Sequence, residues 1–189
     1  MKSLVVVGCL LFFGVVQNRV QASEYVPANV PFSAVMKLPF DAADEQISYG
    51  NDSLQHGLLW LAKNADSEIR KPLLVLIHGG CWLNVFGVDH AQPMSSALAQ
   101  AGFDVWALEY RRTGDQGGGW PGSFEDIQAG IAHVSQLPDG VNRKEVTLIG
   151  HSAGGHLALL AQQKQGANSQ TEIVKTIGLA AITDMSRYA

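Results

Sequence analysis

Residues 145–157, EVTLIGHSAGGHL, decide the fold of this chain. Within and just beyond this stretch, residues 146–149 predict a strand and residues 153–165 predict a helix. The turn between them has the pattern Gly-x-Ser-x-Gly, with Ser152 at its centre. Such a turn raises a serine hydroxyl at the carboxyl end of a sheet, and its glycines let the strand and the helix pass close together. The pattern is common by chance, so the interpretation depends on the strand before it and the helix after it.

Strands alternate with helices on both sides of this turn. Residues 73–77 are an unbroken apolar run that ends at His78, which is typical of a central parallel strand buried on both faces. Further strands are predicted over 56–62, 103–109 and 173–182, and helices over 91–101 and from Ser123 onward, with Ser123 as the helix cap. This alternation predicts an α/β fold, with a mostly parallel sheet covered by helices on both faces.

A second glycine turn follows the strongest strand. His78-Gly79-Gly80-Cys81-Trp82 comes directly after residues 73–77, and backbone N–H groups in such a turn can point at a developing oxyanion. The free N–H of Ala153, at the start of the helix after Ser152, can point the same way. We therefore expect Ser152 to be a nucleophile, with an oxyanion hole made from the following backbone amides: Gly79, Gly80, Cys81 and Ala153. His78 is expected to support this turn through hydrogen bonds.

Five sequence features together resemble the esterase branch of the α/β-hydrolases. They are the segments 78–82 and 109–111, Pro121, the pair 125–126, and the segment 150–157. The likeness is to kynurenine-formamidase-like, feruloyl-esterase-like and hormone-sensitive-lipase-like members, and it covers roughly residues 54–184. It implies an eight-stranded sheet, hydrolysis of a carboxylic ester or an aryl formamide, and neither metal nor organic cofactor. It also implies an ion pair between Glu109 and Arg111 under the site.

The family places its catalytic acid and histidine after the serine. Here the sequence ends thirty-seven residues beyond Ser152, and no histidine follows His156. Asp184 matches a structural aspartate of the family that lies one strand too early for the catalytic acid. We therefore expect the C-terminal strands, the acid and the base to lie beyond Ala189, and residues 1–189 alone to be weakly active or inactive, because the members of a triad act as a unit.

The N-terminus has the layout of a secretory signal peptide. Lys2 precedes an apolar run over residues 4–16, and Val20-Gln21-Ala22 suits cleavage after Ala22. The run has thirteen residues, whereas a spanning helix needs about 20, so an uncleaved anchor is the weaker alternative. We expect a signal peptide over 1–22, an N-terminal arm over 23–46, a partial hydrolase domain over 47–189, and a secreted or periplasmic location.

The composition of the chain argues against several classes of binding partner. The chain has 189 residues, a net charge of -4 and no Lys/Arg cluster, which disfavours nucleic acid and anionic membrane surfaces. No histidine or cysteine pair has the spacing of a zinc site. Cys81 would be the single cysteine of the mature chain, so no intrachain disulfide is expected. The expected partner is a small ester or amide, and the oligomeric state is left open.

Three further residues are candidates for the walls of a substrate pocket: Trp82, Trp120 and His151. Core packing is at least as good an interpretation for the two tryptophans. Two other functions stay open. One is a non-catalytic hydrolase-like remnant or binding protein, and the other is a serine peptidase of the prolyl-oligopeptidase kind, which has the same Gly-x-Ser-x-Gly-Gly turn.

Overall fold

The computed structural model describes residues 30–63, 71–166 and 169–188 of the chain. The expected signal peptide over 1–22 and the first part of the expected arm lie outside these residues. The chain divides into two units, residues 1–30 and 31–189, and the second contains all the secondary structure described below. No helix in the described ranges is long and apolar enough to cross a membrane.

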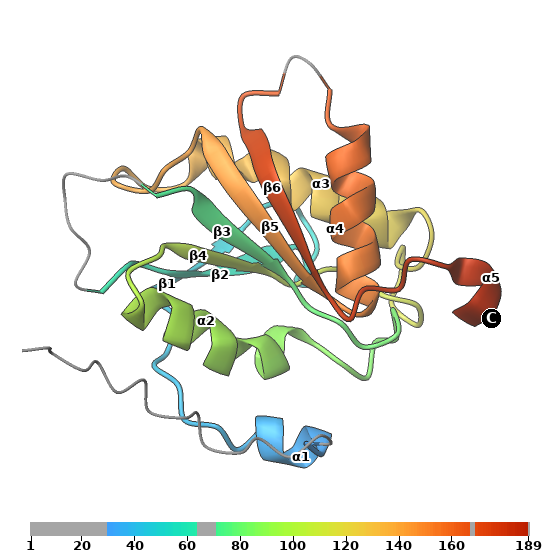
Figure 1. Cartoon of the computed structure of the whole chain (residues 1–189). Helices are drawn as coiled ribbons and strands as arrows, with labels where there is room; N and C mark the ends of the chain where they lie inside the picture. The colour runs from blue at the N-terminus through green and yellow to red at the C-terminus, as the bar shows by residue number, and fades with distance from the viewer. Residues whose placement is uncertain (1–29, 64–70, 167–168, 189) are drawn as a thin grey trace, which may run out of the picture. The chain divides into compact units, whose positions relative to one another are not determined.

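The second unit contains a six-stranded mixed sheet in the order β1-β2-β4-β3-β5-β6 (Figure 1). The strands are β1 (Glu45–Ser48), β2 (His56–Trp60), β3 (Leu73–Ile77), β4 (Val105–Leu108), β5 (Glu145–His151) and β6 (Glu172–Leu179). The first two strands pair antiparallel, and β2 also pairs antiparallel with β4. The remaining four strands run parallel to one another, which confirms the predicted mostly parallel sheet.

Helices cover both faces of the sheet (Figure 1). One face carries α2 (Gln92–Gln100), which follows the short 3₁₀ helix η1 (Val88–Ala91). The other face carries α3 (Gly122–Ala132) and α4 (Ala153–Lys164). The remaining helical segments are α1 (Phe32–Val35), η2 (His133–Gln136) and α5 (Met185–Tyr188). The α/β fold class predicted from the sequence is thus confirmed.

The core forms two apolar layers because side chains alternate along each strand. In β3, Leu73, Val75 and Ile77 pack under α3 and α4, whereas Leu74 and Leu76 pack under α2. All five side chains are buried, as the unbroken apolar run predicts. Burying each of these side chains contributes roughly 1.5–3 kcal/mol to the free energy of folding. This central strand is therefore a rigid base for the loops at its carboxyl end.

Two details differ from the sequence-based expectations. The arm before the sheet contains the helical turn α1, and the first strand begins at Glu45, two residues before the expected domain boundary. The predicted cap at Ser123 is wrong. Helix α3 already begins at Gly122, so Ser123 lies inside the first turn, where its buried hydroxyl donates to the carbonyl oxygen of Arg111 at 2.6 Å.

Candidate functional site

Ser152 sits on a sharp turn between β5 and α4. Its backbone angles, φ 52° and ψ -116°, lie in a region that residues with a side chain rarely adopt. The glycines around it allow the close approach that such a turn requires. A Cβ atom on Gly150 would lie 2.3 Å from the carbonyl oxygen of Gly154, and one on Gly154 would lie 2.2 Å from the carbonyl oxygen of Ile77. The turn therefore depends on both glycines of the pattern.

The end of β6 and the residues directly after it hold this turn in place. The amide of Ser152 donates to the carbonyl oxygen of Leu179 at 2.9 Å, and the amide of Ile182 donates to the carbonyl oxygen of Ser152 at 3.2 Å. Gly155 packs so closely on Ala181 that a Cβ atom at position 155 would lie 2.6 Å from the Ala181 side chain. Sequence reasoning missed this support, because it comes from a strand that is adjacent only in the folded sheet.

The glycine loop after β3 lies directly against the serine. A Cβ atom on Gly79 would lie 3.2 Å from Cβ of Ser152 and 2.8 Å from the His151 ring. The next three residues, Gly80, Cys81 and Trp82, have positive φ angles of 114°, 54° and 58°. The structure thus brings together the predicted serine and the predicted loop, and Ala153 lies fully buried at the first position of α4.

A buried network supports the loop from below, as expected for His78. Nδ1 of His78 is 2.8 Å from the carbonyl oxygen of Gly79, and its Nε2 is 2.9 Å from Oε1 of Glu109. Arg112 lies 3.1 Å from the same carboxylate oxygen. The side chains of all three residues are at most 7% exposed. We call His78, Glu109 and Arg112 the loop network.

Glu109 is held as a carboxylate. Burial alone would raise its pKa, but hydrogen bonds from His78 and from the amides of Val88 and Tyr110, together with the charge on His78, hold the pKa below the usual range of a glutamate. Tyr110 adds two contacts to the loop network. Its ring stacks on His78 at 4.4 Å between centroids, and its hydroxyl donates to the carbonyl oxygen of His78 at 3.0 Å.

The predicted ion pair between Glu109 and Arg111 is wrong. Arg111 instead donates to Asp126 in α3 from its backbone amide and from two guanidinium nitrogens, at 2.9, 2.9 and 2.6 Å. Gln55 donates to the same carboxylate at 2.7 Å. The strand β4 ends at Leu108, so the alternation that would place residues 109 and 111 on one side no longer holds. We call Gln55, Arg111 and Asp126 the helix network.

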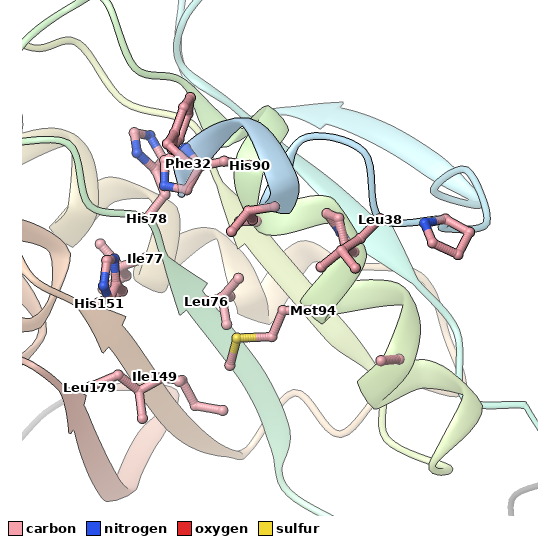
Figure 2. A pocket seen from close by; sticks show the side chains of 15 residues that line it. Phe32, Leu38, Leu76, Ile77, His78, His90, Met94, Ile149, His151 and Leu179 are labelled. Carbon is pink, nitrogen blue, oxygen red and sulfur yellow. The ribbon is translucent and has the colours of Figure 1, made fainter. Parts of the chain in front are cut away.

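Two cavities flank the turn, and they divide the predicted pocket residues. The first, of about 580 Å³, lies on the α2 side (Figure 2). It is almost wholly apolar and includes His151, His78 and His90. Burial, the largest cause, and the nearby rings of His78 and His151 lower the pKa of His90 to about 4. The predicted pocket residue His151 therefore lies apart from the two tryptophans.

The second cavity, of about 540 Å³, lies on the side of α3 and α4. Trp82 and Trp120 both line it, together with Cys81. His156 also lines it and meets the Trp82 ring edge-on, with 5.5 Å between centroids. Burial lowers the pKa of His156. The aromatic lining would suit a flat or apolar part of a substrate.

No group of three metal-ligating side chains occurs within the described ranges. Cys81 is a free thiol whose Sγ lies 3.0 Å from the hydroxyl of Tyr188. Asp184 is exposed and bonds its own neighbours, Ser186 and Arg187, which suits a local structural role.

A mixed α/β sheet, a strained serine turn at its carboxyl end and a glycine loop packed on that turn define an α/β-hydrolase of the esterase type. Comparison with protein families supports this class. Residues 59–187 match the BD-FAE family, and the chain belongs to that family.

Curated relatives are esterases by name. Over 125 residues the chain is 32% identical to the probable carboxylic ester hydrolase LipM of Mycobacterium tuberculosis, covering 64% of this chain and 28% of LipM. Over 118 residues it is 29% identical to the esterase LipC of the same organism, covering 61% of this chain and 28% of LipC. The chain thus spans between a quarter and a third of the length of these relatives.

Solved structures share the fold at low identity. Esterase B from Lactobacillus rhamnosis superposes with a TM-score of 0.67 at 24% identity, over 83% of this chain and 55% of that one. A bacterial heroin esterase superposes with a TM-score of 0.63 at 22% identity, over 80% of this chain and 49% of that one.

Proposed function

We propose that the protein hydrolyses carboxylic esters, with Ser152 as the nucleophile. The observation that carries this proposal is the strained backbone of Ser152 beside the glycine loop at 79–81. Oγ of Ser152 attacks the acyl carbon while a base accepts its proton, and the carbonyl oxygen becomes an oxyanion near the amides of the loop and of Ala153. The alcohol then leaves with a proton, and water hydrolyses the acyl-enzyme.

The general base in this proposal comes from outside residues 1–189. Three histidines lie near the site: His78, His156 and His151. Both ring nitrogens of His78 face oxygen partners, and His156 packs against Trp82. His151 precedes the serine on the strand and faces the cavity on the α2 side (Figure 2). We therefore propose that a histidine and an orienting carboxylate reach Ser152 from sequence after Ala189.

The two cavities are proposed to hold the two sides of the ester. The cavity lined by Trp82 and Trp120 offers aromatic walls, and the one beside His151 offers an aliphatic surface. Esters with small polar groups on both sides would leave these walls uncovered, so we expect them to be poor substrates.

The test uses the full-length product of the gene and the substitution Ser152→Ala. We expect hydrolysis of p-nitrophenyl esters to fall by at least about 10³-fold, and labelling by a fluorophosphonate probe to be lost. Ser135→Ala is the matched control, because the Ser135 hydroxyl bonds only the local carbonyl of Ala132 and should leave both readouts unchanged. Full activity in Ser152→Ala would refute the proposal.

The residues before the arm support a proposal of export. Cleavage after Ala22 would give a mature protein that begins at Ser23. Mass spectrometry of the protein from its native host tests this, and an intact N-terminus in the cell fraction would contradict it.

A further inference from the structure

The His78 side chain fixes the orientation of the Gly79 carbonyl group, and this also fixes the direction of the Gly80 backbone N–H. A peptide unit is planar and trans, so its C=O and N–H groups point in opposite directions. The carbonyl of Gly79 shares a peptide unit with the N–H of Gly80. Because Nδ1 of His78 holds that carbonyl at 2.8 Å, the N–H of Gly80 is turned away from the His78 ring. The ring of His78 therefore sets the direction of one of the loop amides proposed for the oxyanion hole.

The loop network also sets the charge of this ring. The carboxylate of Glu109 accepts from the amides of Val88 and Tyr110 at 3.0 and 2.9 Å, and it forms an ion pair with Arg112, whose Nη1 lies 3.1 Å from Oε1. These donors engage both carboxylate oxygens, so Glu109 is ionised and can only accept from His78. The other ring nitrogen faces a carbonyl oxygen, which also only accepts. Both nitrogens of His78 must then carry protons, and the ring is an imidazolium.

Every neighbouring group is compatible with this charge. The attractive partner is Glu109, and Arg112 is neutralised in part by Asp115, 3.2 Å from its Nε. Tyr110 stacks on the ring, and because burial raises its pKa its hydroxyl stays protonated. His90 lies edge-on to His78 at 5.5 Å between centroids and is neutral at pH 7, so it adds no opposing charge (Figure 2).

We propose that Glu109 is a positioning residue: it keeps His78 doubly protonated, and His78 in turn aims the Gly80 amide at the oxyanion. Tyr110 assists by holding the backbone carbonyl of His78 at the base of the same loop. Neither Glu109 nor Tyr110 touches the substrate. The inference rests on the proposed function of the loop, but the charge state of His78 can be measured without any reaction.

The first experiment measures that charge state directly. In full-length protein with ¹⁵N-labelled histidine, the two ring nitrogens of His78 should both show the chemical shifts of protonated nitrogens at pH 7. In Glu109→Gln the carboxylate charge is lost, and we expect His78 to be neutral at the same pH. An unprotonated ring nitrogen on His78 in the wild-type protein at pH 7 would overturn the proposal.

The second experiment compares the kinetics of two carboxylate substitutions. We expect Glu109→Gln to lower kcat for p-nitrophenyl esters by about tenfold or more, with little change in KM, approaching the 10²–10³ typical of a lost oxyanion donor. Asp126→Asn is the matched control, because Asp126 is also a buried carboxylate paired with an arginine but lies outside the loop network. Equal losses of kcat in the two variants would assign Glu109 a purely structural role and overturn the proposal.

A second pair of variants serves if Glu109→Gln does not fold. Tyr110→Phe removes only the hydroxyl that holds the carbonyl of His78, and Tyr49→Phe removes a hydroxyl that holds the carbonyl of Glu109 at 2.5 Å. We expect kcat to fall several-fold in Tyr110→Phe and to stay unchanged in Tyr49→Phe. Unchanged kcat in both would count against the proposal. Full activity in Ser152→Ala, by contrast, would refute the proposed function and leave the charge of His78 to be decided by the ¹⁵N shifts.

Discussion

Two ion-pair networks follow the end of β4, and they stabilise different parts of the molecule. The loop network joins Glu109 to His78 and Arg112, whose side chains are 0% and 6% exposed, beneath the glycine loop. The helix network joins Asp126 to Arg111, whose side chain is 21% exposed, and fixes α3 to the segment after β4. One network surrounds a carboxylate with two buried cations, and the other leaves its cation partly in water.

Because the two networks differ in burial and position, substitutions in them should affect the free energy of unfolding and the turnover of substrate to different extents. Removing one partner of an ion pair leaves the other charge uncompensated, and the penalty grows with the burial of what remains. A substitution in the loop network should therefore affect both the free energy of unfolding and turnover. A substitution in the helix network should affect mainly the free energy of unfolding, and by a smaller amount.

The largest expected effect on stability is that of Glu109→Gln. It removes the carboxylate that His78 and Arg112 share and leaves Asp115 as the carboxylate beside Arg112, and breaking a buried pair in this way typically costs about 3–5 kcal/mol. Urea unfolding of the full-length protein, monitored by tryptophan fluorescence, measures this loss. A change below about 1 kcal/mol would mean that water reaches the Arg112 guanidinium and that the loop network is not buried in solution.

Asp126→Asn should have a smaller effect. Its carboxylate accepts from Arg111 and Gln55, and hydrogen bonds to a charged group contribute roughly 1.5–3 kcal/mol. We expect a loss of about 2 kcal/mol in the same urea experiment, because water can reach the Arg111 guanidinium once its partner is gone. If Asp126→Asn destabilised the protein as much as Glu109→Gln, the difference in burial between the networks would not matter.

Ser123→Ala tests the edge of the helix network. The Ser123 hydroxyl is buried and donates to the carbonyl of Arg111, so its removal leaves that carbonyl without this donor. We expect a loss of about 1 kcal/mol in thermal or urea unfolding, typical of a single neutral hydrogen bond. Ser135→Ala, with an exposed local hydrogen bond, is the control and should change stability by less.

The sequence predicts the sheet well because strand patterns are local. Residues 73–77 are apolar throughout, and this run alone predicts a buried central strand, as observed. The serine turn and the glycine loop were also predicted, because each follows a recognisable strand. Their contact was predicted too, since the carboxyl ends of neighbouring parallel strands meet at one edge of the sheet.

The partners of charged side chains could not be predicted in the same way. The sequence suggests Glu109 with Arg111, but β4 ends at Leu108 and the chain turns, which brings Arg112 to Glu109 instead. Asp126, the partner of Arg111, lies fifteen residues further along, in α3. Such pairings depend on how α3 packs on the sheet, and that packing cannot be predicted from the local sequence around each charged residue.

The smallest expected effect concerns His90, which faces the loop network from η1. Its pKa falls from the ordinary 6.5 to about 4 in the folded protein, first because it is buried and then because His78 and His151 lie near it. Between pH 6.5 and pH 4 the unfolded chain therefore binds a proton at this position that the folded protein does not. Stability consequently falls as the pH is lowered through this window, since the unfolded state binds more protons.

Replacing this imidazole isolates its contribution. We expect His90→Gln to show a flatter decline in the free energy of unfolding between pH 6.5 and pH 4 than the wild-type protein, with little difference at pH 7.5. The effect is moderate because His90 is only half-buried, and solvent screens part of the penalty for its charge. Urea unfolding at four or five pH values measures the two slopes. Parallel slopes would show that His90 takes up its proton as readily in the folded protein as in the unfolded chain, and His78 would then face a charged neighbour at mildly acidic pH.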